Sequence, residues 1–220
     1  MRPGRRTAAI AAVAALGVAG SVLLAIGVAP DGPSAAAAGE SSPAAVTGAP
    51  AAEPAQPTLP PEGVALPTPS SDVHVAVPAL GLDLPVLPLT PDAGVINPPG
   101  LTAAYWIESY GDPVGEAAQA DNTLYVAAHA TGTGEYGFDA LVDAEAAGEG
   151  LAPGDVVEVS TPGGTVDYAV ERTARYAKDE LAAAAEVWEA VPGRLVLITC
   201  FQRAGRDSTE NLVVFAESLT

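Results

Sequence analysis

The chain has 220 residues, with 27 acidic and nine basic side chains and a formal net charge of −18. This length suits one domain with its attachments. Every acidic residue follows residue 30, so the chain beyond that point carries six positive and 27 negative side chains, a formal −21. Such a surface argues against nucleic-acid binding, which depends on Lys and Arg neutralising phosphates. It also opposes adhesion to an anionic membrane surface.

Residues 1–29 predict a membrane anchor. An uncharged stretch from residue 7 to residue 29, rich in Ala, Val, Leu and Ile, follows Arg2, Arg5 and Arg6. About 20 apolar helical residues cross a hydrocarbon core, and a basic cluster on the N-terminal side favours a cytoplasmic N-terminus. We therefore expect a single-pass protein of the cell membrane whose folded part is extracellular. A cleaved signal peptide is the alternative, which the Ala and Gly content leaves open.

Residues 30–71 predict a disordered linker. They consist mainly of Pro, Ala, Ser, Gly and Thr, with scattered acids and few large apolar residues. A segment of this composition cannot bury enough apolar surface to offset the entropy lost on ordering. Within it, residues 66–70 (Leu-Pro-Thr-Pro-Ser) form a proline-rich patch without an assigned role.

Residues 72–220 predict an all-β domain with short helices. Runs rich in β-branched residues and bounded by turn signals indicate about eight strands, and prolines in the second of them suggest an edge position. No alternating βα pattern occurs, so we expect a closed eight-stranded barrel with mostly antiparallel pairing. Residues 178–189 predict a short helix. The expected strands are residues 73–77, 82–89, 103–107, 123–128, 155–160, 165–176, 194–199 and 212–216.

The only cysteine, Cys200, closes the apolar run at residues 195–199, so its thiol should lie at the end of a strand. Outside the cytoplasm thiols are usually paired in disulfides, so a single cysteine there is either buried and inert or retained for its chemistry. A cysteine nucleophile needs a base or a cation that favours the thiolate. His129 ends the strand at residues 123–128 and is the candidate partner.

Other chemistries have weaker support. One cysteine and two histidines without metal-ligand spacing argue against a zinc site, and we expect neither a metal nor a cofactor. No Gly-x-Ser-x-Gly elbow of a serine hydrolase occurs. His74 stands beside Asp72 on the first expected strand, where a solvent-facing or capping role is expected.

The strand-end motifs resemble those of sortases. Residues 125–130 (Tyr-Val-Ala-Ala-His-Ala) are similar to the strand-to-histidine motif of that family, and residues 195–200 (Leu-Val-Leu-Ile-Thr-Cys) to its Thr-Cys motif. Residues 211–216 are similar to its final strand, and residues 138–141 and 153–157 match two further segments. The resemblance covers residues 72–220, and the short anchor with its Ala/Pro-rich linker looks most like class F sortases of actinobacteria.

The resemblance implies a cysteine transpeptidase. Cys200 would attack the Thr–Gly peptide bond of a Leu-Pro-x-Thr-Gly (LPxTG)-like sorting signal and form a thioacyl enzyme. His129 would donate or accept the proton. The implied partners are sorting-signal peptides of surface proteins and an amine acceptor, on a peptidoglycan precursor or a pilin. Residues 7–29 would hold the enzyme in the membrane.

The position of the stabilising positive charge departs from the family. The resemblance implies an arginine where this chain has Thr209, and threonine lacks the charged guanidinium. Acyl transfer requires a donor to the developing oxyanion. Arg206, in the loop after Cys200, is the expected substitute, with Arg203 as the alternative. Thr199 is expected to help shape the substrate site.

Two other functions stay open. An L,D-transpeptidase also uses Cys, His and Arg, although its His and Cys usually lie close in sequence. A sortase-like barrel that has lost its arginine could instead be a non-catalytic or weakly hydrolytic module for binding or assembly at the cell surface. Thr209 is the residue that favours this second alternative.

Overall fold

The computed structural model describes residues 57–143 and 148–219. They belong to one compact unit that spans residues 50–220. Within the described ranges no helix is long and apolar enough to cross a membrane. The expected anchor at residues 7–29 and most of the expected linker lie outside these ranges.

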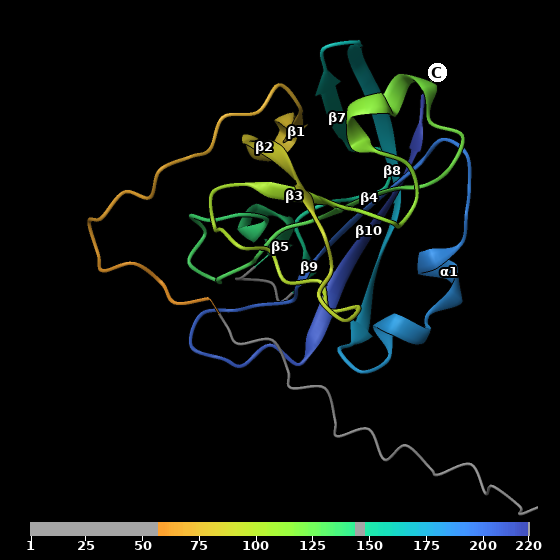
Figure 1. The fold of residues 1–220 in the computed structure, drawn as a ribbon. Coiled ribbons are helices and arrows are strands. Elements are labelled where there is room, and N and C mark those ends of the chain that lie inside the picture. Colours follow the sequence, from red (N-terminus) through yellow and green to blue (C-terminus); the bar gives the residue numbers. More distant parts are fainter. Residues whose placement is uncertain (1–56, 144–147, 220) are drawn as a thin grey trace, which may run out of the picture. The chain divides into compact units, whose positions relative to one another are not determined.

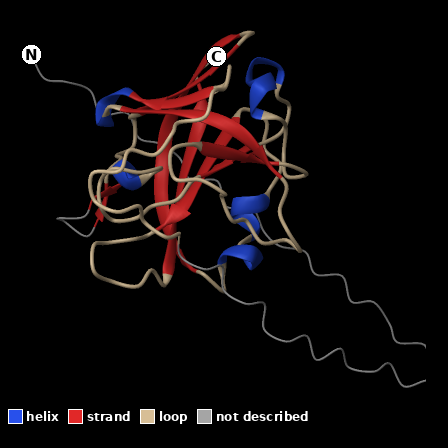
Figure 2. Cartoon of the chain, turned by 60° about the vertical axis from the view of Figure 1, so that its left-hand side comes forward, coloured by secondary structure: helices blue, strands red, loops and turns tan. Residues whose placement is uncertain are grey.

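Eight of the strands within the described ranges close into a barrel in the order β1-β2-β3-β4-β9-β10-β8-β7 (Figures 1 and 2). Each predicted strand is confirmed to within three residues at its ends. The barrel strands are β1 (His74–Val77), β2 (Leu82–Leu89), β3 (Ala104–Ile107), β4 (Leu124–Ala127), β7 (Val156–Thr161), β8 (Gly164–Ala177), β9 (Arg194–Cys200) and β10 (Glu210–Ser218).

The remaining elements are short and lie at the periphery of the barrel (Figure 2). Strands β5 and β6 form a separate two-stranded sheet, which the sequence did not predict. These elements are η1 (Pro78–Leu80), η2 (Val114–Gln119), η3 (Asp139–Leu141), β5 (Val142–Asp143), β6 (Gly148–Glu149), η4 (Leu181–Ala183) and α1 (Ala185–Trp188).

The predicted helix at residues 178–189 is wrong in its continuity. The structure has η4 and α1 instead, separated by Ala184, whose ψ of 88° is not helical. The break allows Leu181, Val187 and Trp188 all to pack on the same face of the barrel. The Trp188 indole Nε1–H donates to the Leu181 carbonyl oxygen at 2.8 Å and closes this segment on itself.

The pairing is mostly antiparallel, as predicted, but two pairs of strands are parallel: β2 with β3 and β4 with β9. Strand β2 is not an edge strand, because β1 pairs with its residues 82–85 and β3 with its residues 86–89. Each half of β2 therefore has one named partner strand. This arrangement accommodates Pro85 and Pro88, whose nitrogens carry no hydrogen to donate.

Strand alternation produces two hydrophobic clusters, one on each face of the barrel wall. All eight barrel strands contribute to the inner cluster, for example Leu124 from β4, Leu197 from β9 and Leu212 from β10. The outer cluster covers β3, β4, β9 and β10, where η4 and α1 pack with Tyr110 against Tyr125. The middle of the wall, β4-β9-β10, is therefore buried on both faces.

Truncating the inner core should destabilise the barrel far more than truncating its surface. Leu197 is 1% exposed and Leu219 is 60% exposed. We expect Leu197→Ala to lower the free energy of unfolding by about 2–5 kcal/mol, because it leaves a cavity that the closed barrel cannot fill. Leu219→Ala should change it by less than about 0.5 kcal/mol. Equilibrium urea unfolding measures both, and equal losses would contradict this description of the core.

Candidate functional site

The parallel pairing of β4 with β9 brings together the two residues singled out in the sequence. The register aligns Leu124 with Leu195 and Ala127 with Ile198. Beyond β4 the pairing continues, because the Ala128 amide donates to the Ile198 carbonyl oxygen at 3.2 Å. The next step of the same register places His129 beside Cys200. Neighbouring strands lie about 4.8 Å apart, so the two residues are lateral neighbours.

Both side chains belong to the outer face of the wall. In β9, Val196 and Ile198 lie in the outer cluster, and Cys200 follows them at the same alternation. Ala128 and Ala130, which follow β4, lie in the inner cluster. His129 stands between them and therefore points to the outer side. The site thus lies where the outer cluster ends, and Cys200 is half-buried there.

Thr199 connects the two strands on the inner side. Its side chain is buried, and its Oγ1 hydroxyl donates to the Ala128 carbonyl oxygen at 2.8 Å. This bond joins the residues immediately before His129 and Cys200, and it fixes the strand ends that carry them. The role of Thr199 in shaping the substrate site stays a prediction.

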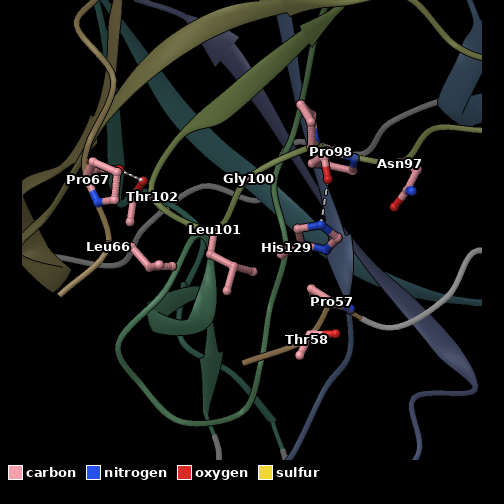
Figure 3. Close-up of a pocket in the computed structure, with 11 residues that line it drawn as sticks. Pro57, Thr58, Leu66, Pro67, Asn97, Pro98, Gly100, Leu101, Thr102 and His129 are labelled. Atoms are coloured by element: carbon pink, nitrogen blue, oxygen red, sulfur yellow. Dashed lines mark hydrogen bonds between the residues drawn. The ribbon is translucent and has the colours of Figure 1, made fainter. Parts of the chain in front are cut away.

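The His129 ring has a defined hydrogen-bond partner. Its Nε2 lies 2.7 Å from the Pro98 carbonyl oxygen, as the dashed line in Figure 3 shows. A carbonyl oxygen only accepts, so Nε2 carries the proton and Nδ1 presents a lone pair when the ring is neutral. Burial lowers the pKa of His129, and the bond to Pro98 offsets part of that effect. The ring is therefore held in its neutral form.

Two close backbone approaches fix the chain at the histidine and in the loop that follows it. A Cβ at Gly137, which has a φ of +50°, would meet the His129 carbonyl oxygen at 2.2 Å. The Phe138 amide donates to the same oxygen at 2.7 Å. A Cβ at Gly132 would meet the Ala204 nitrogen at 2.7 Å, so the loop after His129 packs against the loop after Cys200.

Asp139 organises the loop that follows His129. Its buried carboxylate accepts from the backbone amides of residues 131, 132 and 134–136 and from the hydroxyls of Thr131 and Thr133. Backbone amides that would otherwise lack partners are satisfied in this way. Sequence reasoning treated Asp139 only as part of a family segment. The available signal was the run of Gly and Thr residues at 131–134 shortly before this aspartate.

A cavity of about 470 Å³ lies beside His129 (Figure 3). Residues 97–102 supply one wall and residues 57–67, from the expected linker, supply another. The Thr102 hydroxyl donates to the Pro67 carbonyl oxygen at 2.8 Å and joins the two walls. The lining combines prolines and leucines with the imidazole; its members are Pro57, Thr58, Leu66, Pro67, Asn97, Pro98, Pro99, Gly100, Leu101, Thr102 and His129.

The two expected arginines lie in the loop between β9 and β10. The Arg203 guanidinium lies 5.2 Å from the centroid of the Phe201 ring, which packs in the inner cluster. Arg206 is exposed, and its carbonyl oxygen accepts from the Gln202 side-chain amide at 2.5 Å. Thr209, also exposed, accepts at its carbonyl oxygen from the Lys178 amide. The oxyanion role expected of Arg206 or Arg203 stays a prediction.

His74 has the peripheral role expected from the sequence. Its Nδ1 lies 2.8 Å from Asp83 Oδ1 and its Nε2 lies 3.1 Å from the Ser71 carbonyl oxygen, near the protein surface. Within the described residues, no group of three or more His, Cys, Asp and Glu residues is placed to hold a metal ion.

The sequence matches no protein-family model and no curated protein. Its structure is similar to that of sortases. Sortase A from Listeria monocytogenes has a TM-score of 0.51 at 18% identity, over 68% of this chain and 88% of that one. A lid mutant of sortase A from Corynebacterium diphtheriae has a TM-score of 0.52 at 17% identity, over 73% and 74%. The pilus-related sortase C of Group B Streptococcus has a TM-score of 0.50 at 18% identity, over 68% of each chain.

The chain therefore has the sortase fold. At these identities the likeness extends to the architecture of the barrel alone.

Adding a methyl group at Gly137 should disturb His129, whereas the same change at Gly134 should not. Both glycines have positive φ, so each substitution costs about 1–2 kcal/mol in backbone conformation. A Cβ at Gly134 meets nothing within 4 Å, unlike one at Gly137. We expect Gly137→Ala to be the more destabilising and to shift the His129 imidazole resonances in NMR spectra. Equal unfolding energies with unchanged His129 resonances would contradict this geometry.

The buried neutral imidazole should make stability depend on pH below the ordinary histidine pKa of 6.5. Because the pKa of His129 is lowered in the folded chain, the unfolded chain binds more protons as pH falls from 6.5 toward the folded value, and stability is lost in that window. Replacing His129 by Asn should remove this contribution. Urea unfolding at pH 5–8 measures it: the wild-type curve should fall more steeply than that of the variant below pH 6.5 and parallel to it above pH 7. Parallel curves throughout would contradict the lowered pKa.

Proposed function

We propose that the chain is a cysteine transpeptidase of the sortase type. The observation that carries the proposal is the placement of His129 beside Cys200 at the end of two parallel strands in a sortase fold. A thiol nucleophile requires an adjacent base. In the proposed reaction the neutral His129 ring, with its Nε2 bound to Pro98, accepts the thiol proton at Nδ1.

The proposed reaction proceeds in two acyl transfers. As Cys200 Sγ attacks the scissile carbonyl carbon, its proton passes to His129 and the carbonyl π electrons move to oxygen. The tetrahedral intermediate collapses to a thioester, and His129 returns the proton to the departing amine. An amine acceptor then attacks the thioester, gives up a proton to His129, and regenerates the thiol. In the first acyl transfer the proton moves from the thiol through His129 to the leaving amine, and in the second it moves from the acceptor amine through His129 to the thiol.

The substrate proposed is a sorting signal of the LPxTG type, cleaved between Thr and Gly. The cavity beside His129 is lined by prolines and by Leu66 and Leu101. Apolar walls of this kind suit the leucine and proline of an extended peptide, since pockets bind mainly through apolar contact with a few polar groups. The acceptor is proposed to be an amine of a peptidoglycan precursor or a pilin.

The proposed setting is the cell surface. Residues 7–29 would anchor the chain with its N-terminus in the cytoplasm, as in class F sortases, and the strongly acidic remainder would face outward.

The decisive experiment uses the full-length chain with a panel of sorting-signal peptides, with and without an added amine. We expect cleavage between Thr and Gly, an acyl-enzyme that mass spectrometry detects on Cys200, and an amine-linked product. Cys200→Ala should reduce cleavage to background. Thr209→Ala, at an exposed position of the same hairpin, is the control and should retain activity.

Two results would overturn the proposal: undiminished cleavage by Cys200→Ala, or no cleavage of any peptide by the wild-type chain. The second result, together with peptide binding, would identify a surface binding module.

A further inference from the structure

The residue directly opposite Cys200 on the neighbouring strand is Asn211. Strands β9 and β10 are antiparallel, and their register pairs these two residues. Paired residues of an antiparallel ladder project their side chains to the same face. Asn211 therefore shares the outer face with Cys200, on the side away from His129.

The hydrogen-bond pattern makes this pair a close one. The Phe201 amide donates to the Glu210 carbonyl oxygen at 2.8 Å, and the Ser218 amide donates to the Gly193 carbonyl oxygen at 2.8 Å. Hydrogen-bonded and non-hydrogen-bonded pairs alternate along an antiparallel ladder. Phe201–Glu210 and Gly193–Ser218 are therefore hydrogen-bonded pairs. Cys200–Asn211 is next to the first of them in the ladder, so it is a non-hydrogen-bonded pair. In such pairs the Cα atoms lie about 4.5 Å apart and the side chains approach most closely.

The register extends this row across four strands. His129 lies beside Cys200, Asn211 lies opposite it, and Tyr176 of β8 pairs with Asn211. The Tyr176 hydroxyl is directed away from the thiol, because it donates to Glu186 of α1. The His129 Nε2–H is bound to the Pro98 carbonyl oxygen, so Asn211 is the neighbour of Cys200 in this row that offers a second uncharged N–H donor.

We infer that the Asn211 side-chain amide donates a hydrogen bond to the oxyanion that forms when Cys200 attacks a peptide carbonyl. The inference rests on the proposed acyl transfer. In that step the S–C bond forms, the carbonyl π pair moves to oxygen, and the Asn211 Nδ2–H stabilises the resulting charge until the C=O bond re-forms. A neutral amide supplies a positioned dipole instead of a guanidinium charge, which suits acyl transfer.

The placement of Arg203 and Arg175 supports this assignment. Arg203 stacks on Phe201, one residue after Cys200 and therefore on the opposite face of the strand. Arg175 stacks on the same ring, 4.5 Å from its centroid, and its Nε lies 3.7 Å from Glu210. These two guanidinium groups are held on the inner side of the hairpin, whereas Asn211 is placed beside the thiol by the ladder itself.

The test compares two reactions of Cys200 in the full-length chain. Cleavage of a sorting-signal peptide passes through an oxyanion, whereas alkylation by iodoacetamide is a displacement at carbon that forms none. We expect Asn211→Ala to lower kcat about 10²–10³-fold with little change in KM, and to leave the alkylation rate within about twofold. Asn211→Asp, which has the same shape but no N–H donor, should lose at least as much.

The arginine variants separate the inference from its rival. Arg206→Ala and Arg203→Ala should each keep kcat within about threefold of wild type, and Thr209→Ala serves as the control on the same hairpin. Far-UV circular dichroism and urea unfolding establish that each variant is folded; if Asn211→Ala is not, Asn211→Asp decides.

Near-normal cleavage by both Asn211 variants overturns the inference while the wild-type activity upholds the proposed function. Parallel loss of alkylation and cleavage also overturns it, since Asn211 would then act on the thiol. A wild-type chain that cleaves no peptide overturns the proposed function, and the inference with it.

Discussion

The parallel pairing of β4 with β9 is the constraint on which the site depends. It places His129 next to Cys200. The two residues just before them, Ala128 and Thr199, are 71 positions apart in the sequence, and the Thr199 hydroxyl joins them. A central strand pair buried on both faces cannot slip by one residue without moving its inner side chains to the outer face. The hydrophobic pattern of the wall thus fixes the register of β4 and β9. That register determines which residues lie side by side at the end of the two strands.

Burial and hydrogen bonds to the backbone determine the state of the polar groups around His129 more than nearby charges do. The chain is acidic, and Arg175 and Arg203 stack on the Phe201 ring. His129 is kept neutral by burial and oriented by a carbonyl oxygen. Asp139, the buried carboxylate nearby, is used to hold the loop of residues 131–136. The hydrogen bond from Nε2 to the Pro98 carbonyl oxygen fixes the orientation of the His129 ring.

Local pattern was enough to predict the eight strands and the residues that end two of them, because alternation and turn residues act over a few positions. It could not predict that β4 lies beside β9, since pairing between distant strands is decided by closure of the whole barrel. The same limit applies to Asn211, because only the register between β9 and β10 places it opposite Cys200. Packing of residues 57–67 at the cavity wall and the break at Ala184 likewise follow from tertiary contacts.

The Thr199–Ala128 hydrogen bond joins residues 71 positions apart, so the site can form only late in the folding of the chain. Contacts between distant segments form late, because the entropy of closing the intervening loop must be overcome before they contribute stability. Until β4 and β9 meet, Cys200 has the ordinary reactivity of a thiol in an unstructured segment, with neither a base beside it nor an amide opposite. In the proposed reaction, the thiol would therefore gain its neighbouring groups only when the barrel is complete.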